Sequence, residues 1–304
     1  MKQKFILLAL LLSAPACFAQ PKAGEPELLA KGETGFMCPT WSPDGQKIAF
    51  TSDGFKGVWL IKPDGKNATQ ISDEAGVGYK MSWNADGTTL LVRTNVEKQH
   101  LIYHEIKTID ASTGKTQLLM PATRGLGIAT WRSVSDIALT KAKRPVAISI
   151  NKKQSKESTL SAFELMVSDP FNAAAGIPEL AAYAGKPILN PALSPDKSKI
   201  AFQIAGKGLF VCNSDGTNVY SIGKGSEPTW MPDSKYVIVA RVRDNGEIFT
   251  SSELYAINTE TAEETLFFND SNLLPLTPAV SPDGKKIVFE NDLDGGIYIM
   301  NIKK

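Results

Sequence analysis

The stretch that decides the fold is Trp41-Ser42-Pro43-Asp44-Gly45-Gln46-Lys47-Ile48-Ala49-Phe50. It recurs at residues 83–92, 193–202, 230–239 and 280–289, and a sixth copy, one residue shorter in its turn, runs from Trp131 to Leu139. The copies start at residues 41, 83, 131, 193, 230 and 280, so consecutive starts lie 42, 48, 62, 37 and 50 residues apart. A repeat of about 40–50 residues has the length of one four-stranded blade of a β-propeller.

The chemistry of the motif supports this interpretation. Pro-Asp-Gly favours a turn because proline presets φ, the aspartate side chain bonds its own backbone, and glycine accepts a positive φ. After the turn, alternating apolar residues such as Ile48 and Phe50 indicate a strand with a buried face. A second turn, for example Lys62-Pro63-Asp64-Gly65, follows the third strand. Because one such sheet cannot bury both faces alone, we predict an all-β, six-bladed β-propeller with four antiparallel strands per blade.

Four of the five tryptophans share one repeat position, at Trp41, Trp83, Trp131 and Trp230. This periodicity favours a structural role, in which the indole rings fill the space between blades, over a role in ligand stacking.

The closure of the ring is also predicted. The sixth unit supplies three strands, at residues 276–280, 286–290 and 297–302, and would expose a strand edge if left alone. Residues 26–32 resemble the fourth strands expected at residues 116–119 and 264–268. We therefore expect residues 27–31 to complete blade 6.

Residues 1–19 have the features of a secretory signal peptide. Lys2 and Lys4 precede an apolar run of residues 5–12, which is shorter than the ~20 residues of a membrane span, and Cys17-Phe18-Ala19 resembles a cleavage site. We expect residues 20–304 to be a single propeller domain, periplasmic or secreted, without a transmembrane segment. Lipid attachment at Cys17 is the less favoured alternative, because Ala14 stands where such sites usually carry leucine.

Composition excludes several kinds of function. Lys and Arg number 33 against 32 Asp and Glu, so there is no basic excess for binding nucleic acid. Only two histidines and three cysteines occur, and there is no Gly-x-Ser-x-Gly, His-Glu-x-x-His or phosphate-loop motif. We expect no metal and no cofactor. Cys38 and Cys212 are interpreted as buried side chains rather than a disulfide.

Propeller connectivity groups the candidate binding residues. The loop after the second strand of each blade and the segment that leads into the first strand lie on one face, around the mouth of the central channel. We call this the channel-mouth face. It should collect the polar and aromatic candidates Asp53, Tyr79, Arg93, His100, Arg241, Arg243, Glu290 and Asp292. Residues 151–159 of blade 3 are expected to form a polar insertion loop that projects from the same face.

The repeat motifs resemble those of the TolB-like six-bladed β-propellers, the WD40-like propeller repeat family, over residues 27–304. TolB itself carries a separate α/β domain before its propeller. Here blade 1 is expected within about 20 residues of the cleavage point, which leaves no room for that domain. Related propellers also include polysaccharide lyases.

The function expected from these observations is a non-catalytic scaffold in the cell envelope that binds a protein or peptide partner through its channel-mouth face. The first alternative is a carbohydrate-binding protein or polysaccharide lyase-like enzyme that uses Arg and His residues in the channel, with a glycan as its partner. The second is a structural or sensing subunit of a cell-surface complex. Whether the protein is an enzyme stays open, with the absence of catalytic motifs favouring a binding role.

Overall fold

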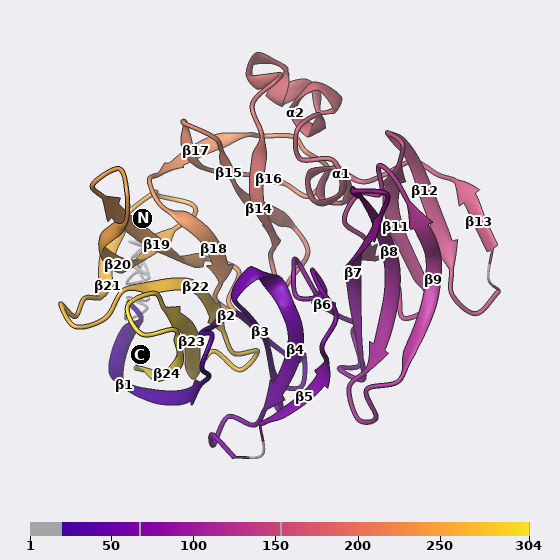
Figure 1. Ribbon diagram of the computed structural model, residues 1–304. Helices are drawn as coiled ribbons and strands as arrows, with labels where there is room; N and C mark the ends of the chain where they lie inside the picture. Colours follow the sequence, from indigo (N-terminus) through magenta and orange to yellow (C-terminus); the bar gives the residue numbers. More distant parts are fainter. Residues whose placement is uncertain (1–19, 67, 153, 304) are drawn as a thin grey trace, which may run out of the picture.

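The computed structural model describes residues 20–66, 68–152 and 154–303, and these residues form six four-stranded sheets arranged as a ring (Figure 1). The predicted six-bladed propeller is therefore confirmed, with antiparallel pairing throughout each sheet. The predicted signal segment, residues 1–19, lies outside the described residues.

Each blade follows the chain order from the channel outward. Blade 1 consists of β2 (Phe36–Trp41), β3 (Ile48–Ser52), β4 (Lys56–Ile61) and β5 (Thr69–Ser72), with a short 3-10 helix η1 (Asp53–Phe55) between β3 and β4. Blade 2 consists of β6 (Ser82–Trp83), β7 (Thr89–Lys98), β8 (Leu101–Asp110) and β9 (Thr116–Thr123). Blade 3 consists of β10 (Thr130–Trp131), β11 (Asp136–Lys141), β12 (Arg144–Ser149) and β13 (Gln154–Glu157).

The second half of the ring repeats this order. Blade 4 consists of β14 (Ile188–Leu193), β15 (Lys199–Ile204), β16 (Gly208–Asn213) and β17 (Tyr220–Gly223). Blade 5 consists of β18 (Ser226–Trp230), β19 (Tyr236–Asp244), β20 (Phe249–Asn258) and β21 (Glu264–Phe268). Blade 6 takes three strands from the end of the chain, β22 (Pro275–Val280), β23 (Lys286–Asn291) and β24 (Gly296–Lys303).

The fourth strand of blade 6 is β1 (Lys22–Lys31), which pairs antiparallel with β24. The predicted closing strand at residues 27–31 is the C-terminal half of this longer strand, whose register runs from Lys22 opposite Lys303 to Lys31 opposite Gly296. In Figure 1 the strands β1 and β24 accordingly lie side by side. The closure leaves β24 paired on both sides, which removes the open edge that three strands would present.

The Pro-Asp-Gly turns are held as their residue types predict. In blade 1 the Ser42 hydroxyl donates to the Asp44 carboxylate at 2.6 Å, and the Gln46 backbone N–H donates to the same oxygen at 3.0 Å. These bonds hold the pKa of Asp44 below its usual value. Blade 4 repeats the arrangement at Ser194 and Asp196, where the pKa is lowered to about 2.

The repeated tryptophans tie neighbouring blades together, which confirms their structural role. Each indole N–H donates to a backbone carbonyl on the innermost strand of the preceding blade. The pairs are Trp41 with Ala279, Trp83 with Thr40, Trp131 with Ser82, and Trp230 with Ala192, at 2.9–3.4 Å. Since Leu193 and Val280 occupy this position in blades 4 and 6, those two junctions lack the indole bond.

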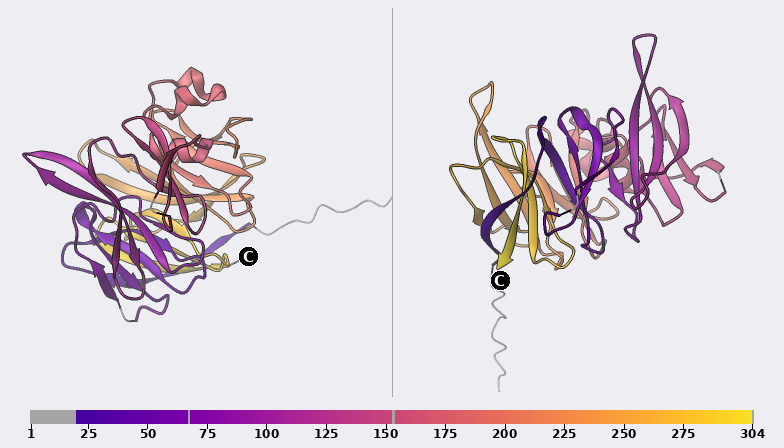
Figure 2. Two further views of the ribbon diagram at one scale, coloured as in Figure 1. Left: turned by 90° about the vertical axis from the view of Figure 1, so that its right-hand side faces the viewer. Right: turned by 60° about the horizontal axis from the view of Figure 1, so that its bottom comes forward.

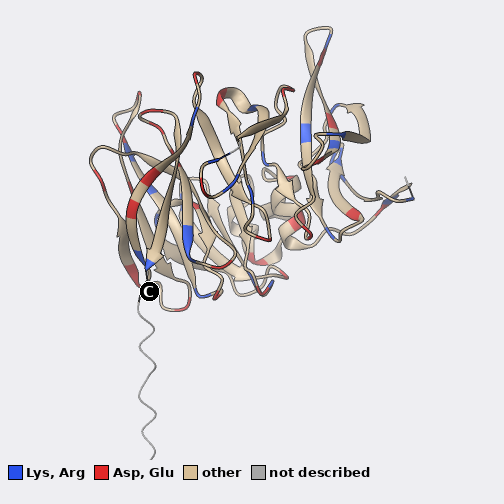
Figure 3. Ribbon diagram, turned by 90° about the horizontal axis from the view of Figure 1, so that it is seen from below, with Lys and Arg blue, Asp and Glu red and all other residues tan. Residues whose placement is uncertain are grey.

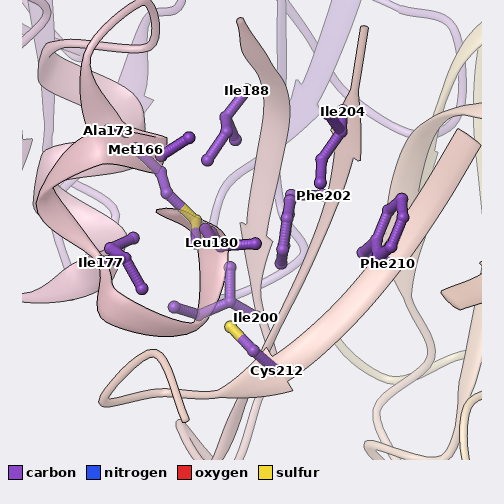
Figure 4. Close-up of a cluster of buried hydrophobic side chains, with 11 residues drawn as sticks. Met166, Ala173, Ile177, Leu180, Ile188, Ile200, Phe202, Ile204, Phe210 and Cys212 are labelled. Carbon is purple, nitrogen blue, oxygen red and sulfur yellow. The ribbon is translucent and has the colours of Figure 1, made fainter. Parts of the chain in front are cut away.

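A helical insertion fills the junction between blades 3 and 4. It contains α1 (Ala162–Ser168), α2 (Ala173–Gly176) and the 3-10 helix η2 (Pro178–Tyr183). Their apolar side chains, including Met166, Ile177 and Leu180, pack on blade 4 residues such as Phe202, in the cluster that Figure 4 shows. The other five junctions are packed directly from sheet to sheet.

Side chains of α1 bind blade 3 as well. The Arg132 guanidinium forms a two-point ion pair with the Glu164 carboxylate, at 2.6 and 2.8 Å. Glu164 also caps α1, because its carboxylate accepts from the Ser161 backbone N–H. The Ser168 hydroxyl accepts the Thr140 backbone N–H. The elements α1, α2 and η2 therefore lie between blades 3 and 4 and bind to both, and we call them the helical wedge.

The expectation of an insertion loop at residues 151–159 was wrong. Residues Gln154–Glu157 form β13, the outer strand of blade 3, with Val146 opposite Glu157 and Ser149 opposite Gln154. The exposed, polar character of these residues reflects an outer strand rather than a loop. The extra length of this repeat lies instead in residues 158–187, which carry the helical wedge.

Candidate binding site at the channel mouth

The inner wall of the channel is built from one repeat position, three residues before the motif start. Five of the six blades hold this residue in the left-handed region, with φ between 45° and 54°. The five residues are Cys38, Lys80, Asn190, Glu227 and Thr277. They line a cavity of about 440 Å³. Because positive φ is unfavourable for residues other than glycine, the recurrence of this conformation marks the position as one that the fold holds under constraint.

Side chains of the second strands hold this inner ring in place. The Glu290 carboxylate of β23 accepts from the Cys38 backbone N–H at 2.5 Å and from the Thr277 hydroxyl at 2.6 Å. Gln203 of β15 plays the same part, since its amide oxygen accepts from the Glu227 backbone N–H at 3.1 Å and the Asn190 amide at 2.8 Å. The buried backbone donors of the bulged strands are thus satisfied by side chains of a neighbouring blade.

Two further contacts join members of the inner ring to one another. The Glu227 carboxylate accepts from the Thr277 backbone N–H at 2.8 Å, and the Lys80 ammonium donates to the Asn190 side chain. The Lys80 contact joins blade 2 to blade 4 past the short inner strand of blade 3.

The channel changes the proton affinity of its charged groups. The pKa of Glu290 is raised to about 7, chiefly by burial and also by the nearby Glu227 and Asp292 carboxylates, against the opposing effect of its two hydrogen bonds. Burial also raises the pKa of Glu227 and lowers that of Lys80. All three shifts have the sign expected when protein replaces water around a charge.

Cys38 and Cys212 are both free thiols. Cys212 is buried in the core of blade 4, as expected, and burial raises its pKa to about 12. Cys38 is half-buried and lines the channel, which differs from the expected core position.

Tyr79 lies where three cavities meet. It lines the channel cavity, an apolar chamber of about 380 Å³ beside blades 2, 3 and 4, and a cleft of about 560 Å³ between blades 2 and 3. The chamber walls include Trp83, Trp131 and Phe163. Arg93 lines the cleft, where its guanidinium faces the Tyr79 ring at 5.5 Å and donates to the Leu126 carbonyl at 3.1 Å.

The other residues that the sequence suggested are spread around the face. Asp53, at the start of η1, and Asp292, in the turn between β23 and β24, are exposed, and Glu290 is buried behind the channel wall. His100 stands at the end of the β7–β8 hairpin, with its side chain fully exposed and 3.8 Å from Glu97. Figure 2 shows this hairpin reaching well beyond the ring.

Arg241 and Arg243 belong to blade 5. Arg241 stacks on Tyr255 at 4.0 Å, pairs with the Glu264 carboxylate and donates to the Lys224 carbonyl, while Arg243 is exposed. Arg93, Arg241 and His100 therefore have separate surroundings and do not converge on one point.

The sequence analysis missed most of the inner ring. Cys38, Lys80, Asn190, Glu227 and Thr277 have no side-chain chemistry in common, so no residue pattern flags them. Their fixed distance from the repeated motif was the signal that could have found them.

Exposed apolar side chains gather on the channel-mouth face. Of the twelve large ones among the described residues, eight lie on its loops, hairpins and strand starts: Tyr79, Leu101, Ile102, Phe171, Leu189, Ile248, Phe249 and Leu293. Charges give no comparable bias, since in Figure 3 basic and acidic segments are interspersed over the ribbon.

Two absences complete the description of the site. Among the described residues, no group of three or more His, Cys, Asp or Glu side chains is placed to hold a metal ion. In the same part of the chain, no helix has both the length and the apolar character needed to cross a bilayer.

The ring and its bulged inner strands define a six-bladed β-propeller with a polar channel. Solved structures with the same architecture include an oligogalacturonate lyase in complex with manganese, with 14% identity and a TM-score of 0.52 over 91% of this chain and 79% of that one. An oligogalacturonate lyase from Vibrio parahaemolyticus has 13% identity and a TM-score of 0.50, with 90% and 79% covered.

TolB from Acinetobacter baumannii is also similar, with 12% identity, a TM-score of 0.50 and coverage of 89% of this chain and 64% of the TolB chain. No family model and no curated protein matches the sequence. At these identities the likeness establishes a shared fold, and the resemblance to TolB-like propellers is confirmed at that level.

Proposed function

We propose that the protein is an exported propeller that binds a protein or peptide partner through its channel-mouth face. The observation that carries this proposal is that eight of the twelve exposed large apolar side chains among the described residues lie on that face. Covering such side chains with a partner removes apolar surface from water, which favours binding.

Two projecting hairpins add to the surface. The β7–β8 hairpin presents Leu101 and Ile102, and the β19–β20 hairpin presents Ile248 and Phe249. Both extend from the same side of the ring in Figure 2. Together with the channel cavity between them, they offer a recessed surface on a rigid scaffold, the usual arrangement for a binding site made of loops.

The lyase alternative has less support in the geometry. Its expected Arg and His groups, Arg93, Arg241 and His100, lie in separate surroundings. The likeness to oligogalacturonate lyases is one of fold, and fold alone does not carry an activity.

The proposal is tested by a matched pair of variants. Ile248→Asp places a charge on the channel-mouth face, while Leu118→Asp places one on the outer strand of blade 2, at similar exposures of 66% and 53%. Envelope extract of the source organism is passed over immobilised wild-type and variant proteins, and a retained protein is then purified and titrated directly.

We expect Ile248→Asp to weaken the purified pair at least tenfold and Leu118→Asp to leave it unchanged. Hydrogen exchange in the complex should slow at the β7–β8 and β19–β20 hairpins. Equal loss in both variants, or protection confined to the opposite face of the ring, would overturn the proposal.

Export is part of the same proposal and rests on residues 1–19. We expect N-terminal sequencing of the protein recovered from its host to begin at Gln20, with the protein in the envelope or secreted fraction. Recovery of a chain that still begins with Met1 in the cytoplasmic fraction would contradict export. It would not bear on the proposed binding surface.

A further inference from the structure

Arg93 has an unusual position for a charged side chain. It is half-buried in the cleft between blades 2 and 3, its Nε is buried and has no hydrogen-bond partner, and its Nη1 donates to the Leu126 carbonyl. None of the ion pairs formed among the described residues includes Arg93. A partly buried charge without a counter-ion is costly, and this cost is relieved when an anion binds beside it.

The acidic and basic groups around the cleft favour an incoming anion. Lys143 lines the same cleft and adds positive charge. Asp169 is the acidic side chain of the lining, and its carboxylate is engaged by the Asn172 amide at 2.8 Å. A planar guanidinium with free N–H groups matches a carboxylate especially well, because two parallel hydrogen bonds can form.

The apolar chamber adjoins the cleft. The two cavities share Tyr79, Ile128 and Pro170 in their linings. Trp83, Trp131, Phe163 and Met166 complete the chamber walls, and its volume is about 380 Å³. A protein cavity of about 150 Å³ already holds a benzene ring, so the chamber accommodates an aromatic or large aliphatic group.

The unsatisfied polar atoms gather at the same place. Four buried side-chain polar atoms of the described residues have no hydrogen-bond partner, and three belong to residues that line the chamber or the cleft: Ser82, Arg93 and Thr130. Buried polar groups are nearly always paired in folded proteins, so the unpaired Arg93 guanidinium nitrogen is the one of these groups that points to a missing acceptor.

We propose that Arg93 and the apolar chamber together bind the C-terminal residue of a polypeptide, with its free carboxylate on the Arg93 guanidinium and its apolar side chain in the chamber. This inference rests on the proposed function and specifies which part of the partner the protein binds. The exposed apolar residues of the channel-mouth face would then contact the residues that precede the terminus.

The test uses three fluorescein-labelled Gly/Ser hexapeptides at several hundred micromolar protein. One ends in phenylalanine with a free carboxylate, the second is its C-terminal amide, and the third ends in glycine with a free carboxylate. Binding is followed by fluorescence anisotropy with the wild-type protein and with Arg93→Gln, Arg93→Lys and Arg144→Gln. Arg144 is exposed at the start of β12, outside the linings of the cleft and the chamber, so Arg144→Gln removes the same charge and serves as the control.

We expect the phenylalanine acid to bind about tenfold to a hundredfold more tightly than its amide and than the glycine acid, in keeping with one charge-assisted bond and one buried side chain. Arg93→Gln should abolish the preference for acid over amide, Arg93→Lys should retain part of it, and Arg144→Gln should retain it fully. If Arg93→Gln does not fold, the comparison of the three peptides on the wild-type protein decides the question.

Failure of this inference and failure of the proposed function give different results. If acid and amide bind equally and Ile248→Asp weakens both, the carboxylate site is refuted while the binding face stands. If none of the peptides binds, the carboxylate site is refuted, and the titration of the captured partner decides the binding face by itself.

Discussion

The Glu290 carboxylate of the last blade accepts the backbone N–H of Cys38 in the first blade, so a side chain with a raised pKa bridges the junction where the ring closes. The same oxygen accepts the Thr277 hydroxyl. One titratable group therefore joins blade 6 to blade 1 beside the channel.

The first prediction concerns pH. Glu290 has a pKa of about 7 in the folded protein against an ordinary value of 4.5. Between these values the folded state keeps the proton and the unfolded state does not, so stability is highest at low pH and falls as pH rises toward 7. The contribution is on the order of 3 kcal/mol over the whole interval, of which about 2 kcal/mol is lost between pH 5.5 and 7. Urea unfolding at pH 5.5 and 8 measures this second part.

Glu290→Gln supplies the control for that measurement. Glutamine keeps one oxygen that can accept both hydrogen bonds and has no proton to lose, so the variant should show a smaller fall in stability over this range. If the free energy of unfolding changes with pH in the same way for wild type and Glu290→Gln, Glu290 does not titrate as described.

The second prediction concerns the tryptophan bridges. Trp230→Phe removes the indole N–H that donates to the Ala192 carbonyl and leaves a small void between blades 4 and 5. We expect a loss of about 1–3 kcal/mol in the free energy of unfolding. Trp59→Phe, outside the repeat position, makes the same change in volume. A cost equal to that of Trp59→Phe would argue against the bridging role.

The third prediction concerns the helical wedge. Glu164→Ala removes both the ion pair with Arg132 and the cap at Ser161, so we expect about 2–4 kcal/mol of destabilisation. Hydrogen exchange should accelerate over residues 161–187 before the rest of the ring. Glu157→Ala, on the exposed strand β13, is the matched control and should change little. Uniform acceleration over all six blades would show that the wedge does not open by itself.

The fourth prediction concerns the strand that closes the ring. Leu29 is 8% exposed and packs between blades 6 and 1, whereas its neighbour Leu28 points to solvent at 53%. Leu29→Asp should cost at least about 3 kcal/mol, because it buries an unpaired charge, and Leu28→Asp should cost less than about 1 kcal/mol. Thermal unfolding compares them. Similar melting temperatures for the two variants would contradict the register of β1.

The sequence predicted the fold well where the structure is local and repeated. The Asp44 and Asp196 turns are each held by bonds within a few residues, so the same short motif specifies the same turn in different blades. The closing strand was found for a related reason, since the apolar pattern of residues 27–31 fits the edge left open by β24.

The sequence did not predict the helical wedge, because the contacts that stabilise these helices are made with residues far away in the chain. Met166 and Leu180 are buried against blade 4, and this requires the ring to place blades 3 and 4 too far apart for direct packing. The candidate site was missed for a different reason. Lys80 and Glu227 share a backbone conformation rather than a side-chain type, and only the assembled ring brings them to one cavity.

The pairing of β1 with β24 also has a consequence for how the protein is made. Because β1 precedes every other strand of the ring and β24 follows them, the seam between them can form only after the strands of all six blades have been synthesised. Until then the growing chain carries unpaired strands at both ends of an open arc. We therefore expect the yield of folded protein to depend on chaperones that shield these strands more than on the folding rate of any single blade.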